Sequence, residues 1–267
     1  MPDPTDLSGL LDIAVDLARG AGAMLVDGFE NRRSMVDTKT SATDMVTEVD
    51  RASEEFIVKG LLELRPLDGI LGEEGANRQG SSGLRWVIDP LDGTTNYLYG
   101  LPAFAVSVAA ELGGRAVVGV VADPSHDEVF TATAGGGAYR NGDRIAVSGV
   151  SDLATALVAT GFAYRRDQRS RQARVLTEVL PAVRDVRRLG AAALDLCWVA
   201  CGRLDAYYEV GIQHWDVAAG GLIALEAGAH VEGLDEVAAG SGSARVIAAT
   251  PALAAPLRQL LDGASPD

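Results

Sequence analysis

The sequence predicts a protein of mixed α and β structure, with helices and an antiparallel sheet in its first half and alternating strands and helices in its second. Three observations lead to this prediction. Apolar residues recur at helical spacing in two segments before residue 66, short β-rich runs separated by turns fill residues 103–147, and strands alternate with helical segments beyond residue 149. Alternation of this kind is typical of α/β architecture.

Composition limits the class of protein. The 267 residues are 48% hydrophobic, which is enough for one large domain or two moderate ones. The formal net charge of −14 disfavours nucleic-acid binding, because such proteins need a basic face. No apolar run approaches the roughly 20 residues of a membrane span, so we expect a cytoplasmic protein. Cys197 and Cys201 are too few for a disulfide framework and are expected to be packed thiols.

The first half begins with two amphipathic helices. The first covers residues 6–29, where leucine and alanine recur at spacings of three and four. The second follows Thr47, a candidate N-cap, and ends at Pro66. Asp50 then falls at the third helical position, so the local sequence supports a capping role and a catalytic role equally. Lys39, in the polar segment between the helices, is interpreted as a solvated side chain.

A short apolar run at residues 70–72 breaks into two neighbouring carboxylates, Glu73 and Glu74, beside glycines. Neighbouring side chains of an extended chain point in opposite directions, so only one of the two can face a shared site. We choose Glu73, because it lies nearer to the end of the predicted strand. The segment thus contributes one candidate acidic ligand.

The stretch WVIDPLDGTTNY ends an apolar run in two carboxylates, Asp89 and Asp92. Its first three residues predict a short buried strand, which should stop at Asp89 because Pro90 has no amide hydrogen for a sheet ladder. Gly93 supplies the backbone freedom that a tight turn needs. Two carboxylates held this close repel each other, and a divalent cation between them relieves the repulsion. The stretch therefore predicts a metal site with oxygen ligands.

Two other interpretations of this stretch stay open at this point. Asp, Pro and Gly are also common in turns, so an acidic turn without a function would look similar. The haloacid-dehalogenase phosphatases also place two aspartates after a strand, but these lie two residues apart and one forms a covalent phosphoenzyme. In this chain Asp89 and Asp92 lie three residues apart, which favours two metal ligands.

The rest of the chain supplies a sheet and an α/β half. Short strands at 103–147, separated by glycine-rich turns, predict an antiparallel sheet. Beyond it we expect strands at 156–160, 186–189, 206–209, near 231 and at 246–249, and helices at 172–183, 191–201, 216–227 and 251–261. The seam is placed after residue 148, giving units at 1–148 and 149–267 or one continuous domain.

A last candidate segment ends in Trp215 and Asp216. Asp216 opens the predicted helix at 216–227, so it could serve only as a first-turn acid that complements the helix N-terminus. The three histidines, His126, His214 and His230, lack acidic or histidine partners at ligand spacing. They are therefore not expected to bind metal.

In combination, four ordered motifs resemble the inositol monophosphatase family of the lithium-sensitive, metal-dependent phosphatase superfamily. These motifs are an aspartate opening the second helix, G-E-E, D-P-x-D-G-T and W-D, which stand here as Asp50, Gly72 to Glu74, Asp89 to Thr94 and Trp215 to Asp216. Four motifs in one order are far more specific than any single motif. The resemblance covers nearly the whole chain and implies the layered αβαβα sandwich of the inositol monophosphatase and fructose-1,6-bisphosphatase type.

The resemblance also implies a site for two Mg²⁺ ions, or three. By the family's pattern, Glu73, Asp89 and the Leu91 carbonyl would hold one ion. The second would be held by Asp89, Asp92 and Asp216, and Glu73 would also be available to a third. Such ions would make an acidic pocket cationic, so that it can accept an anionic substrate.

Catalytic and substrate-binding residues follow from the same resemblance. Asp50 and the Thr94 hydroxyl would orient and deprotonate the attacking water. The residues that would contact the phosphate and the ring hydroxyls are Asp92, Gly93, Thr94, Arg187, Ala192 and Glu209. Two departures are typical of the bacterial branch, namely Ala191 for the threonine of animal members and Gly161 to Ala163 for a segment that there supplies a serine. They leave the metal site untouched but put the identity of the sugar in question.

The implied activity is Mg²⁺-dependent hydrolysis of myo-inositol 1-phosphate by direct in-line attack of an activated water, in a homodimer. The same chemistry could act on histidinol phosphate, fructose 1,6-bisphosphate or a 3′,5′-bisphosphonucleotide. A further alternative is a regulatory binding protein, since some bacterial relatives associate with transcription machinery. The expected partner is a small anionic sugar or cyclitol phosphate, with no nucleic acid and no membrane.

Overall fold

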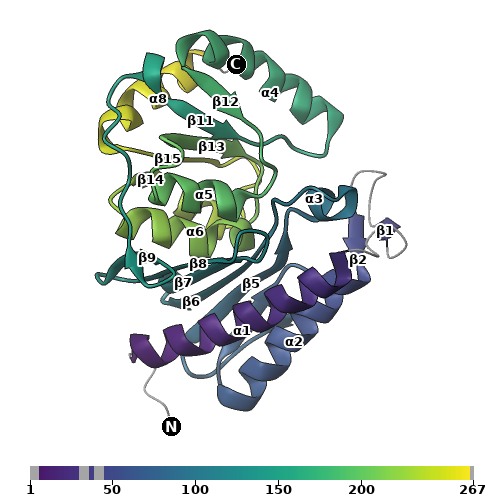
Figure 1. Cartoon of the computed structure of the whole chain (residues 1–267). Helices are drawn as coiled ribbons and strands as arrows, with labels where there is room; N and C mark the ends of the chain where they lie inside the picture. Colours follow the sequence, from purple (N-terminus) through teal and green to yellow (C-terminus); the bar gives the residue numbers. More distant parts are fainter. Residues whose placement is uncertain (1–5, 30–35, 39–44, 265–267) are drawn as a thin grey trace.

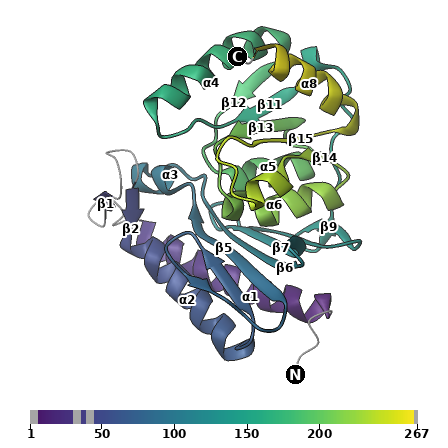
Figure 2. The same ribbon diagram turned by 180° about the vertical axis from the view of Figure 1, so that it is seen from behind.

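The computed structural model of the chain describes residues 6–29, 36–38 and 45–264. Lys39 and the side chain of Thr47 lie outside the described parts, so the two expectations for them stand as predictions. Figures 1 and 2 show five stacked layers in which helices and sheets alternate. The expected αβαβα sandwich is thereby confirmed. In the described ranges, no helix combines the length and apolar character that crossing a membrane requires.

Two helices form the outer layer nearest the N-terminus, α1 (Leu7–Gly28) and α2 (Glu48–Leu64) (Figure 1). Asp6 caps α1 by accepting a hydrogen bond from the Gly9 amide at 3.2 Å. The buried residues of both helices recur at spacings of three and four, which places one apolar face of each against the first sheet. Asp50 is the third residue of α2, as predicted.

An eight-stranded sheet forms the second layer, in the order β10-β9-β8-β7-β6-β5-β3-β4. Its strands are β3 (Gly69–Gly72), β4 (Asn77–Arg78), β5 (Leu84–Asp92), β6 (Ala105–Leu112), β7 (Arg115–Asp123), β8 (Glu128–Thr133), β9 (Gly137–Arg140) and β10 (Asp143–Arg144). All neighbouring pairs are antiparallel except β3 and β5. The predicted antiparallel sheet is therefore present. A separate two-stranded ribbon joins β1 (Val36–Thr38) to β2 (Met45–Thr47).

The prediction that the strand stops at Asp89 is wrong, because β5 continues to Asp92. The neighbouring β6 stays paired beside it, with Asp89 opposite Ser107 and a register irregularity before Asp92. Pro90 is tolerated because it falls within this irregularity, where no ladder hydrogen bond needs its missing amide hydrogen. The two carboxylates consequently belong to one sheet strand rather than to a loose turn.

The third, fourth and fifth layers contain the second half of the chain (Figure 2). The middle helices are α5 (Ala192–Ala200) and α6 (His214–Glu226), and the outer ones are α4 (Arg166–Val179) and α8 (Pro251–Ala264). Between them lies a sheet of β11 (Leu157–Thr160), β12 (Asp185–Arg187), β13 (Ala206–Val210), β14 (His230–Glu232) and β15 (Arg245–Ala249). β11 is parallel to β12 and β13, whereas β15 is antiparallel to β13 and β14. Two short helices are α3 (Thr94–Tyr99) and α7 (Leu234–Ala238).

The helix predicted at 172–183 is misplaced at both ends. The observed α4 begins six residues earlier, at Arg166, and gives way to a 3₁₀ turn containing Pro181. Its only buried residue is Val179, so most of this arginine-rich surface helix has no apolar face for a sequence pattern to detect. The short helix α7 was not expected at all, because five residues are too few to show a helical period.

Helices α5 and α6 are buried on both faces. One face packs against first-sheet residues such as Val87 and Phe130, and the other against second-sheet residues such as Tyr207. Cys197 lies inside this layer and is a packed thiol, as expected. Shared packing of this kind joins the two halves, and the division into units at 1–148 and 149–267 stays a prediction.

Gly119 on β7 sets how closely α6 can approach the first sheet. A Cβ atom at this position would lie 2.8 Å from the Ala219 carbonyl oxygen, which is backbone and cannot rotate away. We expect Gly119→Ala to lower the free energy of unfolding by about 1 to 3 kcal/mol, measured by urea denaturation. Gly149→Ala is the control, because its Cβ would meet nothing within 4 Å. Equal stabilities of the two variants would contradict this account of the packing.

Candidate active site

A cavity of about 660 Å³ opens where the ends of several strands and helices meet. Its lining comes from five separate segments of the chain, at residue 73 and at residues 89–94, 162–168, 188–192 and 209–216. All four acidic side chains predicted as metal ligands line it, namely Glu73, Asp89, Asp92 and Asp216. Glu74 does not, in keeping with the choice of Glu73 from the alternation of an extended chain.

Backbone amides hold the two carboxylates of β5 in fixed orientations. Asp89 Oδ1 accepts a hydrogen bond from the Leu91 amide at 3.0 Å. Asp92 Oδ2 accepts one at 2.7 Å from the amide of Ala193, in the first turn of α5. Both side chains are buried, with exposed fractions of 1% and 8%. The site is thus built from a sheet strand and a helix start that lie about a hundred residues apart in the chain.

Asp216 has two roles at once. Its Oδ2 accepts a hydrogen bond from the Gln213 amide at 2.7 Å, which forms a capping box at the start of α6. The same side chain lines the cavity. From the other side, Ser107 on β6 donates to the Trp215 carbonyl at 3.3 Å and so links α6 to the strand beside Asp89. Asp216 therefore caps the first turn of α6, as predicted from the sequence, and also lines the cavity.

Burial and mutual repulsion raise the pKa values of these carboxylates. The pKa of Asp89 lies well above its usual value, first because of desolvation and then because of the charges of Glu73 and Asp92. The pKa of Asp216 is raised by the same causes. Desolvation raises the pKa of Asp92 to about 6, although amides around Ala193 lower it in part. Such a set of oxygen donors is stabilised by a hard divalent cation.

The carboxylates line the same cavity but are not already arranged as the ligands of a metal ion. In the ranges that the structure describes, no group of three or more Asp, Glu, His or Cys side chains is already arranged to hold a metal ion. The donor chemistry and the raised pKa values fit a divalent cation, and the amide contacts orient the carboxylates toward one cavity. The fit to Mg²⁺ therefore rests on chemistry rather than on preformed coordination.

Asp50 and Thr94 meet beside these carboxylates. Thr94 Oγ1 lies 3.5 Å from Asp50 Oδ2 and donates to the Leu91 carbonyl at 3.1 Å. Asp50 is only 1% exposed, which a helix cap at the surface would not require. Gly93 precedes Thr94 with a φ of 90°, and a Cβ there would come within 2.7 Å of the Ala103 carbonyl oxygen. Only glycine therefore suits this turn.

Glu209 forms the opposite wall of the cavity. The Tyr207 hydroxyl, two residues away on β13, donates to Glu209 Oε2 at 2.9 Å. Burial raises the pKa of Glu209 to about 7, although Tyr207 and Arg188 act in the other direction. A Cβ on Gly161 would lie 2.0 Å from Glu209 Oε2, so the glycine is what leaves room for the carboxylate. Ala192, at the start of α5, also lines the cavity.

The prediction that Arg187 lines the site is wrong. Its guanidinium instead pairs with Asp185 at 2.6 Å, on the exposed side of β12. The neighbouring Arg188 lines the cavity, and its charge lowers the pKa values of Asp92 and Glu209. Consecutive side chains of a strand face opposite ways, so an error of one position moves the guanidinium out of the site.

Sequence reasoning also missed other residues of the lining, among them Tyr164, Arg165 and Arg166. A signal for them exists in the run RRDQRSRQAR, because so many arginines in one segment are unusual in a chain with a net charge of −14. Together, Arg165, Arg166 and Arg188 give the acidic cavity a basic rim. Such a rim favours the approach of an anion.

Comparisons with known proteins agree with this geometry. The model of the inositol monophosphatase family matches residues 6–263. The chain is similar to inositol-1-monophosphatase SuhB of Mycobacterium tuberculosis, with 49% identity over 82% of this chain and 78% of that protein. It is also similar to Nus factor SuhB of Pasteurella multocida, with 44% identity over 83% and 84%. Among solved structures, the extragenic suppressor protein suhB of Bartonella henselae gives a TM-score of 0.89 at 37% identity, covering 95% of this chain and 98% of that one.

Without divalent metal, the protein should become less stable as the pH rises from about 4 to about 7. The folded-state pKa values of Asp92 and Glu209 are about 6 and about 7, against ordinary values of 3.8 and 4.5. The folded protein therefore binds more protons than the unfolded chain in this interval, and each rise in pH favours unfolding.

Thermal unfolding in a chelator measures this effect. We expect a lower Tm at pH 8 than at pH 5, and recovery of Tm at pH 8 when Mg²⁺ replaces the chelator. Asp92→Asn should flatten the pH dependence, because an amide does not ionise. A Tm that does not change between pH 5 and pH 8 would contradict the electrostatic account.

Proposed function

The chain belongs to the inositol monophosphatase family, and we propose that it hydrolyses myo-inositol 1-phosphate to inositol and phosphate in a Mg²⁺-dependent reaction. The family consists of metal-dependent phosphomonoesterases. One observation carries the proposal: four acidic side chains and Thr94, which contacts Asp50, line one cavity with a basic rim. Similarity to proteins named inositol-1-monophosphatase supports the choice of substrate.

The metal site consists of Glu73, Asp89, the Leu91 carbonyl, Asp92 and Asp216, and holds two Mg²⁺ ions or three. Their oxygen atoms are the ligands that Mg²⁺ prefers. When bound, Mg²⁺ lowers the pKa of a water and shields the charge of the phosphoryl oxygens. The amide contacts of Asp89, Asp92 and Asp216 keep these side chains oriented while they bind.

Thr94 and Asp50 supply the acid–base chemistry. The Thr94 hydroxyl would accept a hydrogen bond from the attacking water and turn its own proton from the Leu91 carbonyl, at 3.1 Å, to Asp50 Oδ2, at 3.5 Å. The water forms a new bond to phosphorus and gives up one proton to the Thr94–Asp50 pair, while the ester bond on the opposite side breaks and the departing alcohol oxygen takes a proton from solvent. No covalent intermediate with the protein is formed, and the backbone amides of Gly93 and Thr94 contact the phosphate.

Glu209, Asp92 and Ala192 contact the alcohol half of the substrate. An ionised carboxylate accepts hydrogen bonds from neighbouring hydroxyls, and Arg188 favours the ionised form of Glu209. Arg188 thus takes the place at which Arg187 was expected. We also propose a homodimer, supported by the large exposed side chains of Tyr99 and Tyr164, which line a pocket next to the catalytic cavity.

A second candidate function is regulatory binding. Similarity to proteins named Nus factor SuhB, such as that of Pasteurella multocida, supports it. The presence of every acidic motif residue favours retention of the phosphatase activity beside any such role. The two functions separate in Asp92→Asn, which removes the activity but leaves the surface unchanged.

Phosphate release from four substrates tests the proposal directly. We expect faster turnover of inositol 1-phosphate than of histidinol phosphate, fructose 1,6-bisphosphate or a 3′,5′-bisphosphonucleotide. Asp92→Asn should lower kcat/KM on the order of 10³-fold, because it removes a metal ligand charge. Asp143→Asn, on an exposed strand, is the matched control. Turnover of inositol 1-phosphate at background level would contradict the proposal. In a separate experiment, a phosphoenzyme trapped with hydroxylamine would indicate the covalent mechanism instead.

Two adjacent arginines test the assignment of the substrate wall. Arg188→Ala should raise KM on the order of tenfold with a smaller effect on kcat, because it removes a charge that favours ionised Glu209 and an anionic ligand. Arg187→Ala should leave both constants unchanged, because its guanidinium pairs with Asp185 outside the cavity. Steady-state kinetics compares the two variants. A larger increase in KM for Arg187→Ala than for Arg188→Ala would contradict this assignment and indicate that Arg187 contacts the substrate.

A further inference from the structure

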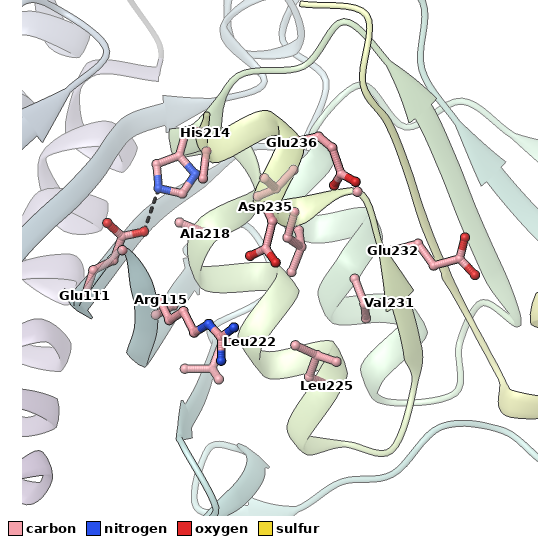
Figure 3. Close-up of a pocket in the computed structure, with 16 residues that line it drawn as sticks. Glu111, Arg115, His214, Ala218, Leu222, Leu225, Val231, Glu232, Asp235 and Glu236 are labelled. Carbon is pink, nitrogen blue, oxygen red and sulfur yellow. Dashed lines mark hydrogen bonds and ion pairs between the residues drawn. The ribbon is translucent and has the colours of Figure 1, made fainter. Parts of the chain in front are cut away.

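A second cavity, of about 610 Å³, lies behind α6 and shares no lining residue with the catalytic cavity (Figure 3). It is bounded by α6, by the turn between β6 and β7, and by the segment from β14 into α7. We call it the rear cavity. Its size falls within the range of small-molecule sites, which occur often between two packed units of a fold.

Most of the wall of the rear cavity is apolar. The apolar side chains come from β7, α6, β14 and α7, and they include Ala116, Val217, Leu222, Leu225, Val231 and Leu234. Leu225 is 44% exposed, so the cavity offers apolar surface that the protein leaves in contact with water. Burying such surface is the main source of affinity for a small ligand with an aliphatic part.

The charged groups of the rear cavity differ in whether they are already paired. Glu111 accepts from Arg85 and from His214, both at 2.6 Å, and Glu232 pairs with His230 and Arg258. Three lining residues, Arg115, Asp235 and Glu236, form no ion pair with any other residue in the described ranges. Figure 3 shows that Arg115 and Asp235 reach the cavity from different walls.

We propose that the rear cavity binds a free amino acid with an aliphatic side chain. Arg115 would hold the carboxylate through its planar guanidinium, and Asp235 with Glu236 would hold the ammonium group. The aliphatic part would pack on Leu222 and Leu225. A zwitterion uses both kinds of free charge, whereas a plain anion would face two carboxylates and a plain amine would leave Arg115 without a partner.

The first turn of α6 separates the two cavities. His214 lines the rear cavity, and the next two residues, Trp215 and Asp216, line the catalytic one. Glu111 and Ser107, on β6, bind this turn at His214 and at the Trp215 carbonyl. A ligand that moves His214 therefore moves a predicted metal ligand. We infer that a ligand in the rear cavity changes the affinity of the protein for Mg²⁺. This inference rests on the metal site of the proposed function, whereas the binding of the ligand in the rear cavity does not.

Titration calorimetry on the full chain in a chelator tests the binding alone. L-leucine is the probe, and 3-methylbutylamine and 4-methylpentanoate each lack one of its two charges. We expect L-leucine to bind on the order of tenfold more tightly than either, because each charged contact strengthens binding by about that factor. Absence of binding, or equal affinity for all three compounds, would overturn the proposal.

Variants locate the site and separate it from catalysis. Arg115→Ala and Asp235→Asn, both at exposed positions, should weaken L-leucine binding on the order of tenfold. Arg19→Ala, an exposed arginine on α1, should not change it. Asp92→Asn should bind L-leucine like the unaltered protein, so an error in the proposed function does not affect this result. Unchanged binding by both Arg115→Ala and Asp235→Asn would place the ligand elsewhere.

The coupling has its own measurement. Mg²⁺ affinity is determined by titration with and without saturating L-leucine, and we expect it to differ several-fold. His214→Ala should keep L-leucine binding within a few-fold but remove this difference, since the ring is the link to the first turn of α6. Equal Mg²⁺ affinity under the two conditions would overturn the coupling.

Discussion

Repulsion among closely placed carboxylates is the constraint on which the site depends. Charges of one sign interact more strongly in a protein interior than in water, so a cluster that includes Glu73, Asp89 and Asp216 opposes folding. Two features offset this cost. Backbone amides hold the aspartates, and a large apolar core surrounds them. A divalent cation would neutralise the cluster, so the energy that the repulsion costs the fold would be recovered as binding energy for the metal.

The middle layer of helices converts this local chemistry into a single cavity. Because α5 and α6 are buried against both sheets, their first turns are fixed relative to β5 on one side and β13 on the other. Those turns carry the Ala193 amide and the Asp216 carboxylate. The first sheet thus contributes Asp89 and Asp92 to one wall of the cavity, and the second sheet contributes Glu209 to the other. Residues on the second wall can therefore change while those on the first stay constant.

The sequence predicted those site residues that a local pattern marks, and it did not predict features that depend on tertiary structure. Asp89 and Asp92 were found because a run of apolar residues that ends in two acids is informative by itself, and Glu73 was found by alternation. The continuation of β5 through Pro90 was missed, since it depends on how β6 pairs beside it. Arg187 was expected in the site and Arg188 was missed, because a resemblance gives position along the chain but not the direction in which a side chain points. The proximity of Asp50 and Thr94 came only from the resemblance, because their elements are far apart in the chain.

The contact between Gly161 and Glu209 has a consequence for the history of the protein. A single added methyl group at residue 161 would occupy the space of the Glu209 carboxylate. A lineage that enlarges residue 161 must therefore also shorten or redirect residue 209, because the two side chains cannot occupy the same space. Related sequences with new preferences should carry the two exchanges together, as a correlated pair on neighbouring strands β11 and β13.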